Sequence, residues 1–77
     1  MSTVYRLIDA QERIFDKACK KLKGAKKAFG PDRAAASELM SDARDALSRA
    51  RAEGERTSMP KLEAKVDAFK DAVDGLL

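Results

Sequence analysis

Apolar and small residues recur at alternating steps of four and three along almost the whole chain. This heptad spacing places them on one face of an α-helix that packs against another helix. The first run contains Val4, Ile8, Gln11, Phe15, Ala18, Leu22, Ala25 and Phe29. We therefore expect an all-α protein whose helices pair along heptad-type seams.

Two breaks divide the pattern. Gly30-Pro31 combines a residue that favours helix ends with one that cannot continue a helix, and the polar segment that begins at Gly54 is a loop. The sequence predicts one helical domain over residues 1–77. Its elements are expected to be a helix over 3–29, a helix over 32–53, a loop over 54–58 and a helix over 59–75.

The second and third helices carry different seams. Alanines dominate the second, which comprises Ala36, Met40, Ala43, Leu47 and Ala50. Larger side chains form the third, which comprises Met59, Leu62, Val66, Phe69, Val73 and Leu76. Because short connections make neighbouring helices antiparallel, we expect an antiparallel three-helix bundle. The alternative is a long helical hairpin with a docked third helix, and either would use coiled-coil packing.

The core that these seams can form is small. Only 15 of the 77 residues are Leu, Ile, Val or Phe, whereas 14 are alanine. Chains of this size usually gain stability from disulfides, a structural metal or association. One cysteine excludes an intrachain disulfide, and the same cysteine without any histidine excludes an ordinary zinc site. Association is the remaining route, so we expect a homodimer.

Several function classes are disfavoured. Without histidine no side chain titrates near neutral pH unless its pKa is strongly shifted, and the four glycines form no phosphate-binding loop. We therefore expect no enzymatic activity, no catalytic residue, no metal, no cofactor and no small-molecule substrate. No apolar run is long enough to span a membrane, and the N-terminus does not resemble a signal peptide. A cytoplasmic protein is expected.

The N-terminal half of the first helix is apolar over a wide arc. Its candidate partner-binding or oligomer-binding residues are Val4, Tyr5, Leu7, Ile8, Gln11, Ile14 and Phe15. One interpretation is that two helices of the same chain flank this arc; the other is a homodimer seam or a docking groove for another protein. Gln11, at a seam position, either fixes register with a symmetry mate or is partly exposed near the bundle end.

Charge is distributed unevenly. Residues 1–33 carry a net charge of +5 and residues 34–77 carry −2. A block of lysines, the candidate nucleic-acid-binding or anion-binding residues, comprises Lys17, Lys20, Lys21, Lys23, Lys26 and Lys27. The block contains no arginine or aromatic side chain for base contacts. Its simpler interpretation is a solvated face that pairs with the acidic line of Glu63, Asp67, Asp71 and Asp74.

Cys19 lies at the margin of the first seam among lysines. Neighbouring cations can lower a thiol pKa and make it reactive, although a thiol that fills a core boundary is the simpler interpretation.

These observations favour a small non-catalytic protein–protein interaction module. It would act as an adaptor, an assembly subunit or an inhibitor of a host or partner protein, a type common among phage and mobile-element products. The alternative is an accessory nucleic-acid-binding protein that uses the lysine face. The expected partners are another protein, a second copy, or both.

Overall fold

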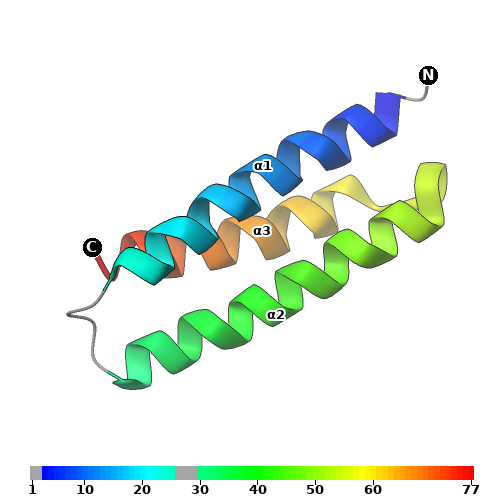
Figure 1. Ribbon diagram of the computed structural model, residues 1–77. Coiled ribbons are helices and arrows are strands. Elements are labelled where there is room, and N and C mark those ends of the chain that lie inside the picture. Colours follow the sequence, from blue (N-terminus) through cyan, green and yellow to red (C-terminus); the bar gives the residue numbers. More distant parts are fainter. Residues whose placement is uncertain (1–2, 26–29) are drawn as a thin grey trace.

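The computed structural model describes residues 3–25 and 30–77. They form helix α1 (Thr3–Gly24), helix α2 (Gly30–Glu53), a short 3₁₀ turn (Gly54–Arg56) and helix α3 (Met59–Asp74). α2 runs back along α1, and α3 runs back along α2, so the C-terminus lies beside the last turn of α1 (Figure 1). Each helix contacts the other two. The fold is an all-α three-helix bundle, elongated to 42 × 16 × 15 Å.

The core consists of the residues that the heptad spacing predicted. α1 contributes Ile8, Phe15, Ala18 and Leu22, and α3 contributes Leu62, Val66, Phe69 and Val73. The Phe15 and Phe69 rings meet with their centroids 5.3 Å apart and their planes tilted by 47°. Tilted aromatic pairs at this distance contribute about 0.5–1.5 kcal/mol beyond their area burial. This pair joins α1 to α3 at the centre of the bundle.

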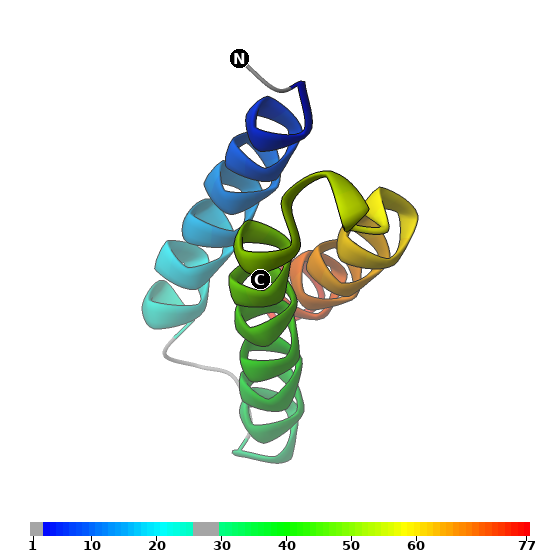
Figure 2. The ribbon, with the colours of Figure 1, turned by 90° about the vertical axis from the view of Figure 1, so that its right-hand side faces the viewer.

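α2 packs differently, because its buried face is mostly alanine. Ala36 and Ala43 have no exposed surface, and Ala50 has 2%. Small side chains let a helix approach its neighbours closely, which increases contact between backbones rather than side-chain volume. In a second view the three helices are seen more nearly end-on, with α2 in front of the contact between α1 and α3 (Figure 2). The alanine face of α2 is therefore buried against both α1 and α3.

Three element ends differ from expectation. The first helix, expected over 3–29, ends at Gly24, and Ala25 is not helical; residues 26–29 of that expectation lie outside the described residues. Glycine is about 1 kcal/mol worse than alanine inside a helix. The freed Ala25 carbonyl accepts a hydrogen bond from the Arg33 guanidinium. The Ala25 carbonyl, which follows the end of α1, is thus satisfied by a side chain of α2.

The second and third differences are small. α2 begins at Gly30, two residues before the expected start, because Pro31 fits the first turn of a helix, where its missing N–H costs no hydrogen bond. α3 ends at Asp74 rather than at residue 75, and the Gly75 amide closes the last turn on Asp71 at 3.0 Å.

The connection between α2 and α3 is ordered by hydrogen bonds and by one glycine. Gly54 has a φ of +59°, a left-handed conformation that side chains other than glycine adopt only at a cost. The Thr57 hydroxyl donates to the Ala50 carbonyl at 2.9 Å and so satisfies a carbonyl near the end of α2. Ser58 is the N-cap residue of α3, although its side chain makes no capping hydrogen bond.

Candidate functional site

The structure divides the predicted partner-binding residues into three groups. Ile8 is fully buried and Phe15 is 7% exposed, so both belong to the core of the single chain. Val4, Gln11 and Ile14 are half-buried. Tyr5 and Leu7 are each 44% exposed. The wide apolar arc is thus covered in part by α2 and α3, and only its margins reach solvent.

One margin carries an apolar strip, which comprises Leu7, Ala10 and Ile14. At about 100° per residue these side chains lie within about 60° of one another. Leu7 and Ala10 are exposed, and Ile14 packs partly against the core. Cations follow further along this flank, where the Lys21 ammonium lies 3.5 Å from the Asp74 carboxylate of α3.

Gln11 lies between the apolar strip and the core. Its side-chain oxygen is buried and has no hydrogen-bond partner among the described residues. An unpaired buried polar atom costs about 1–3 kcal/mol. Gln11 is therefore a buried polar group, unpaired among the described residues, between the strip and the core.

The other margin of the arc is occupied within the chain. The Tyr5 hydroxyl lies against Gly54, at 2.8 Å from the point where a Cβ on residue 54 would lie. Tyr5 is therefore held against the connection between α2 and α3, which gives it a structural role in addition to the predicted binding role.

Three arginines along one flank of α2 all contact α1 or the residue that follows it. Arg51 donates to the Asp9 carboxylate at 2.8 Å and also to the Glu12 carboxylate. The Arg44 guanidinium lies 5.9 Å from the centroid of the Phe15 ring. With the hydrogen bond from Arg33, these contacts close the α1–α2 side of the bundle.

The hydrogen bonds that Arg51 donates to the carboxylates, first to that of Glu12 and then to that of Asp9, raise the pKa of Arg51. These hydrogen bonds connect this flank of α1 to α2.

Part of the predicted lysine block is occupied by an ion pair within the chain. Lys17, Lys20 and Lys23 are exposed, whereas Lys21 pairs with Asp74. Lys26 and Lys27 lie outside the described residues. Asp74, which belongs to the acidic line on α3, accepts a second hydrogen bond from Lys70 at 3.2 Å. One ion pair between the lysine face and the acidic line is thus present in the structure.

Sequence reasoning missed two cations that extend this surface. Arg6 and Arg13 are exposed and lie on the outward side of α1, in line with Lys17 and Lys20. Their spacing of seven, four and three residues was available in the sequence. Asp16 separates both arginines from the run of lysines, so the block was defined without them.

The Cys19 thiol is not activated. Burial raises its pKa above the ordinary value and outweighs the nearby Arg44, which lowers it. A raised pKa reduces the thiolate fraction and hence the reactivity. Neighbouring cations therefore lower this pKa less than burial raises it, which favours the simpler interpretation of Cys19 as a half-buried residue at the core boundary.

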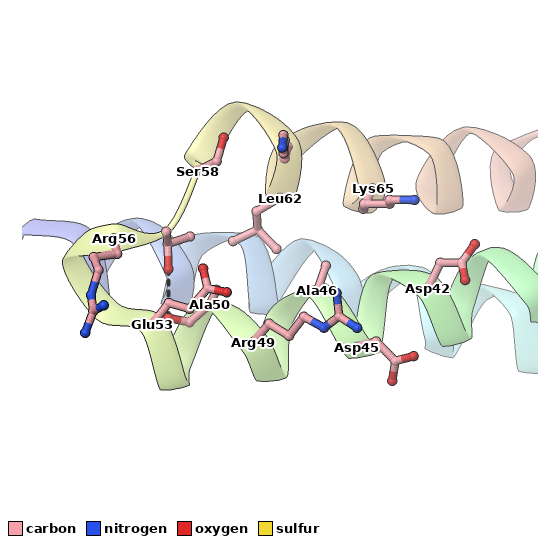
Figure 3. A pocket seen from close by; sticks show the side chains of 12 residues that line it. Asp42, Asp45, Ala46, Arg49, Ala50, Glu53, Arg56, Ser58, Leu62 and Lys65 are labelled. Carbon is pink, nitrogen blue, oxygen red and sulfur yellow. Dashed lines mark hydrogen bonds between the residues drawn. The ribbon is translucent and has the colours of Figure 1, made fainter.

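A groove lies between α2 and α3, beside the connection that joins them. This groove has a volume of about 520 Å³. Figure 3 shows the Leu62 side chain pointing from α3 toward α2, with Asp42, Asp45, Arg49 and Lys65 around it. Acidic and basic side chains alternate around the opening, so its charge matches no single class of ligand.

Residues 3–25 and 30–77 contain no group of three or more Cys, Asp or Glu side chains arranged to hold a metal ion. Within the same ranges, none of the helices is both long enough and apolar enough to cross a membrane. Comparison of the chain with protein-family models, curated proteins and solved structures finds no match.

Proposed function

We propose that this chain is a non-catalytic protein–protein interaction module whose binding element is the apolar strip of α1. The observation that carries the proposal is the exposure of Leu7, which leaves 44% of a large apolar side chain in solvent beside half-buried Ile14. Single exposed leucines are ordinary, but Leu7 continues a line of apolar residues along one helix flank. An adaptor, assembly subunit or inhibitor would use such a flank.

A second copy of the chain is the partner that fits the strip. Leu7 and Ile14 are seven residues apart, and the small Ala10 lies between them. Two antiparallel copies of α1 centred between residues 10 and 11 would place each Leu7 opposite the partner's Ile14. A twofold contact requires this kind of self-complementarity, and a small residue at its centre permits close approach of the backbones.

Gln11 adds a polar element to the same contact. It lies beside the proposed twofold axis, and its side-chain oxygen has no partner among the described residues of one copy. Two Gln11 amides that face each other across the axis can exchange hydrogen bonds. A polar residue at one seam position is known to fix the register of paired helices.

The proposed dimer is weak. The bundle core is closed within one chain, because Ile8, Phe69 and Val73 are buried without a partner. Dimerisation therefore adds a small interface rather than completing the fold, and small interfaces belong to the transient class. Concentration-dependent association is expected, not an obligate dimer.

Sedimentation equilibrium tests the proposal with Leu7→Asp. The apparent mass of the wild type should rise with concentration from 8.4 kDa toward twice that value. Leu7→Asp should remain a monomer with unchanged helical circular dichroism, because a carboxylate on the strip cannot be desolvated without a partner. The matched control is Leu77→Asp, which changes an exposed leucine outside the strip. It should associate like the wild type.

Wild-type protein that stays monomeric at the highest soluble concentration would contradict the proposal that a second copy is the partner. Equal association of Leu7→Asp and the wild type would show that another surface is used.

A further inference from the structure

The outward face of α1 carries a column of cations, which we call the cation stripe. It comprises Arg6, Arg13, Lys17 and Lys20, all exposed. None of the four forms an ion pair with another residue in the described part of the chain. At 1.5 Å per residue the stripe is about 21 Å long. The core contacts of the bundle do not require these charges.

The acids nearest to the stripe are largely engaged elsewhere. Asp9 and Glu12 are held by Arg51 on the flank that faces α2. On the opposite flank, Asp74 of α3 is shared between Lys21 and Lys70. Asp16 remains as an exposed acid at the border of the stripe. Because Arg51 balances only one of the two carboxylates that it holds, the positive potential of the stripe is reduced by two net negative charges. It is directed away from α2 and α3.

We infer that the cation stripe binds the phosphate backbone of double-stranded nucleic acid without sequence preference. Duplex DNA carries one phosphate per about 3.4 Å along each strand, so about six phosphates match the length of the stripe. Arg6 and Arg13 can make bidentate contacts with phosphate oxygens, whereas Lys17 and Lys20 act as point charges.

The side chains around the stripe favour a duplex over other polyanions. Single-stranded binding relies on stacking, and the stripe contains no aromatic residue. Binding at a membrane surface and at an acidic protein both use apolar or aromatic side chains among the charges. Ala10 lies between Arg6 and Arg13, and it belongs to the apolar strip that borders the stripe and exposes Leu7. The stripe itself contains only charged side chains, so a ligand recognised by its phosphate charges is the best match.

Fluorescence anisotropy with a labelled mixed-sequence DNA duplex of about 20 base pairs tests the inference. Neutralisation of four phosphates predicts a salt slope of about −3.6, so affinity should fall roughly 150-fold between about 50 and 200 mM salt. The double variant Arg13→Glu/Lys17→Glu should lose at least tenfold in affinity at the lower salt concentration, with unchanged helical circular dichroism.

The matched control is Lys61→Glu/Lys65→Glu. These two exposed lysines lie on α3 beside the groove that faces α2, and their replacement changes the net charge by the same amount. The control variant should bind the duplex much more tightly than the stripe variant does. If both double variants lost the same affinity for the duplex, net charge alone would explain binding and the inference would be overturned.

Two further outcomes would also contradict it. One is the absence of an anisotropy change at low salt. The other is preferential binding to polyglutamate or to vesicles that contain about one-third phosphatidylserine, which would assign the stripe to an acidic protein or a membrane surface.

Leu7→Asp should bind the duplex like monomeric wild type, because Leu7 lies about 100° around the helix from Arg6.

Discussion

The hydroxyl of Tyr5 lies against the backbone of Gly54, so that a Cβ added at residue 54 would be 2.8 Å from the Tyr5 oxygen. Gly54 also has a φ of +59°. The first turn of α1 and the end of α2 are thus joined at a residue that is required to be glycine for two reasons. Because Tyr5 is 44% exposed and its hydroxyl is at the end of the side chain, the ring can move aside. The backbone conformation is therefore the stronger constraint.

Gly54→Ala should lower the free energy of unfolding by about 1–2 kcal/mol, the usual cost of a left-handed conformation for a residue with a Cβ. Gly54→Asn should lose less, because asparagine tolerates this conformation although its Cβ meets Tyr5 equally. Urea denaturation followed by circular dichroism measures both. In a Tyr5→Ala background the cost of Gly54→Ala should stay within about 0.5 kcal/mol of its original value. Equal costs for Ala and Asn would show that contact with Tyr5 is the dominant constraint.

The alanine face of α2 provides a second prediction. Ala43 has no exposed surface, so Ala43→Leu must separate α2 from its neighbours and should destabilise the bundle by about 1–3 kcal/mol. Ala35 is exposed on the same helix, and Ala35→Leu should change stability by no more than about 0.5 kcal/mol. Urea midpoints compare the two variants. A neutral Ala43→Leu would mean that α2 does not pack closely.

Acid pH should weaken the two ion pairs of Asp74, one with Lys70 within α3 and one with Lys21 of α1. The hydrogen bond from Lys70, with a contribution from Lys21, lowers the pKa of Asp74 below its ordinary value of 3.8. A lowered pKa in the folded state stabilises the fold above the unfolded value, and this stabilisation is lost as pH falls through the folded value. Asp74→Asn should therefore be less stable than wild type near neutral pH and equal to it in strong acid.

Urea midpoints across the acid range measure this convergence. The control is Asp42→Asn, which removes a carboxylate that forms no ion pair with the described residues. If the gap between Asp74→Asn and wild type stayed constant from neutral to strongly acidic pH, the ion pairs of Asp74 would not be its source.

The core could be predicted from the sequence because heptad spacing is a local property. Ile8, Leu47 and Val66 were each assigned to a seam, and each is buried. The segment that begins at Gly54 was likewise recognisable as a connection, because a glycine and polar residues interrupt the spacing. These features depend on neighbours within one or two helical turns.

The remaining features depend on residues that are far apart in the chain. The contacts of Tyr5 with Gly54 and of Arg51 with Asp9 join positions more than 40 residues apart, and no local pattern predicts them. The end of α1 at Gly24 was missed because the heptad pattern continues to Phe29. There the weak helix propensity of glycine and the contact of Arg33 with Ala25 outweigh the apolar spacing.

Disulfide cross-linking measures the proposed pairing of two α1 helices most directly. In a Cys19→Ser background, Ala10→Cys places one thiol per chain near the proposed twofold axis. Lys21→Cys places a thiol on the same flank, but in the antiparallel pair the two copies would be about 30 Å apart along the helix axis. Disulfides require Cα atoms within about 7 Å. After correction for thiol reactivity by iodoacetamide, Ala10→Cys should cross-link much faster than Lys21→Cys. Equal rates at the two positions would contradict an antiparallel dimer through the apolar strip.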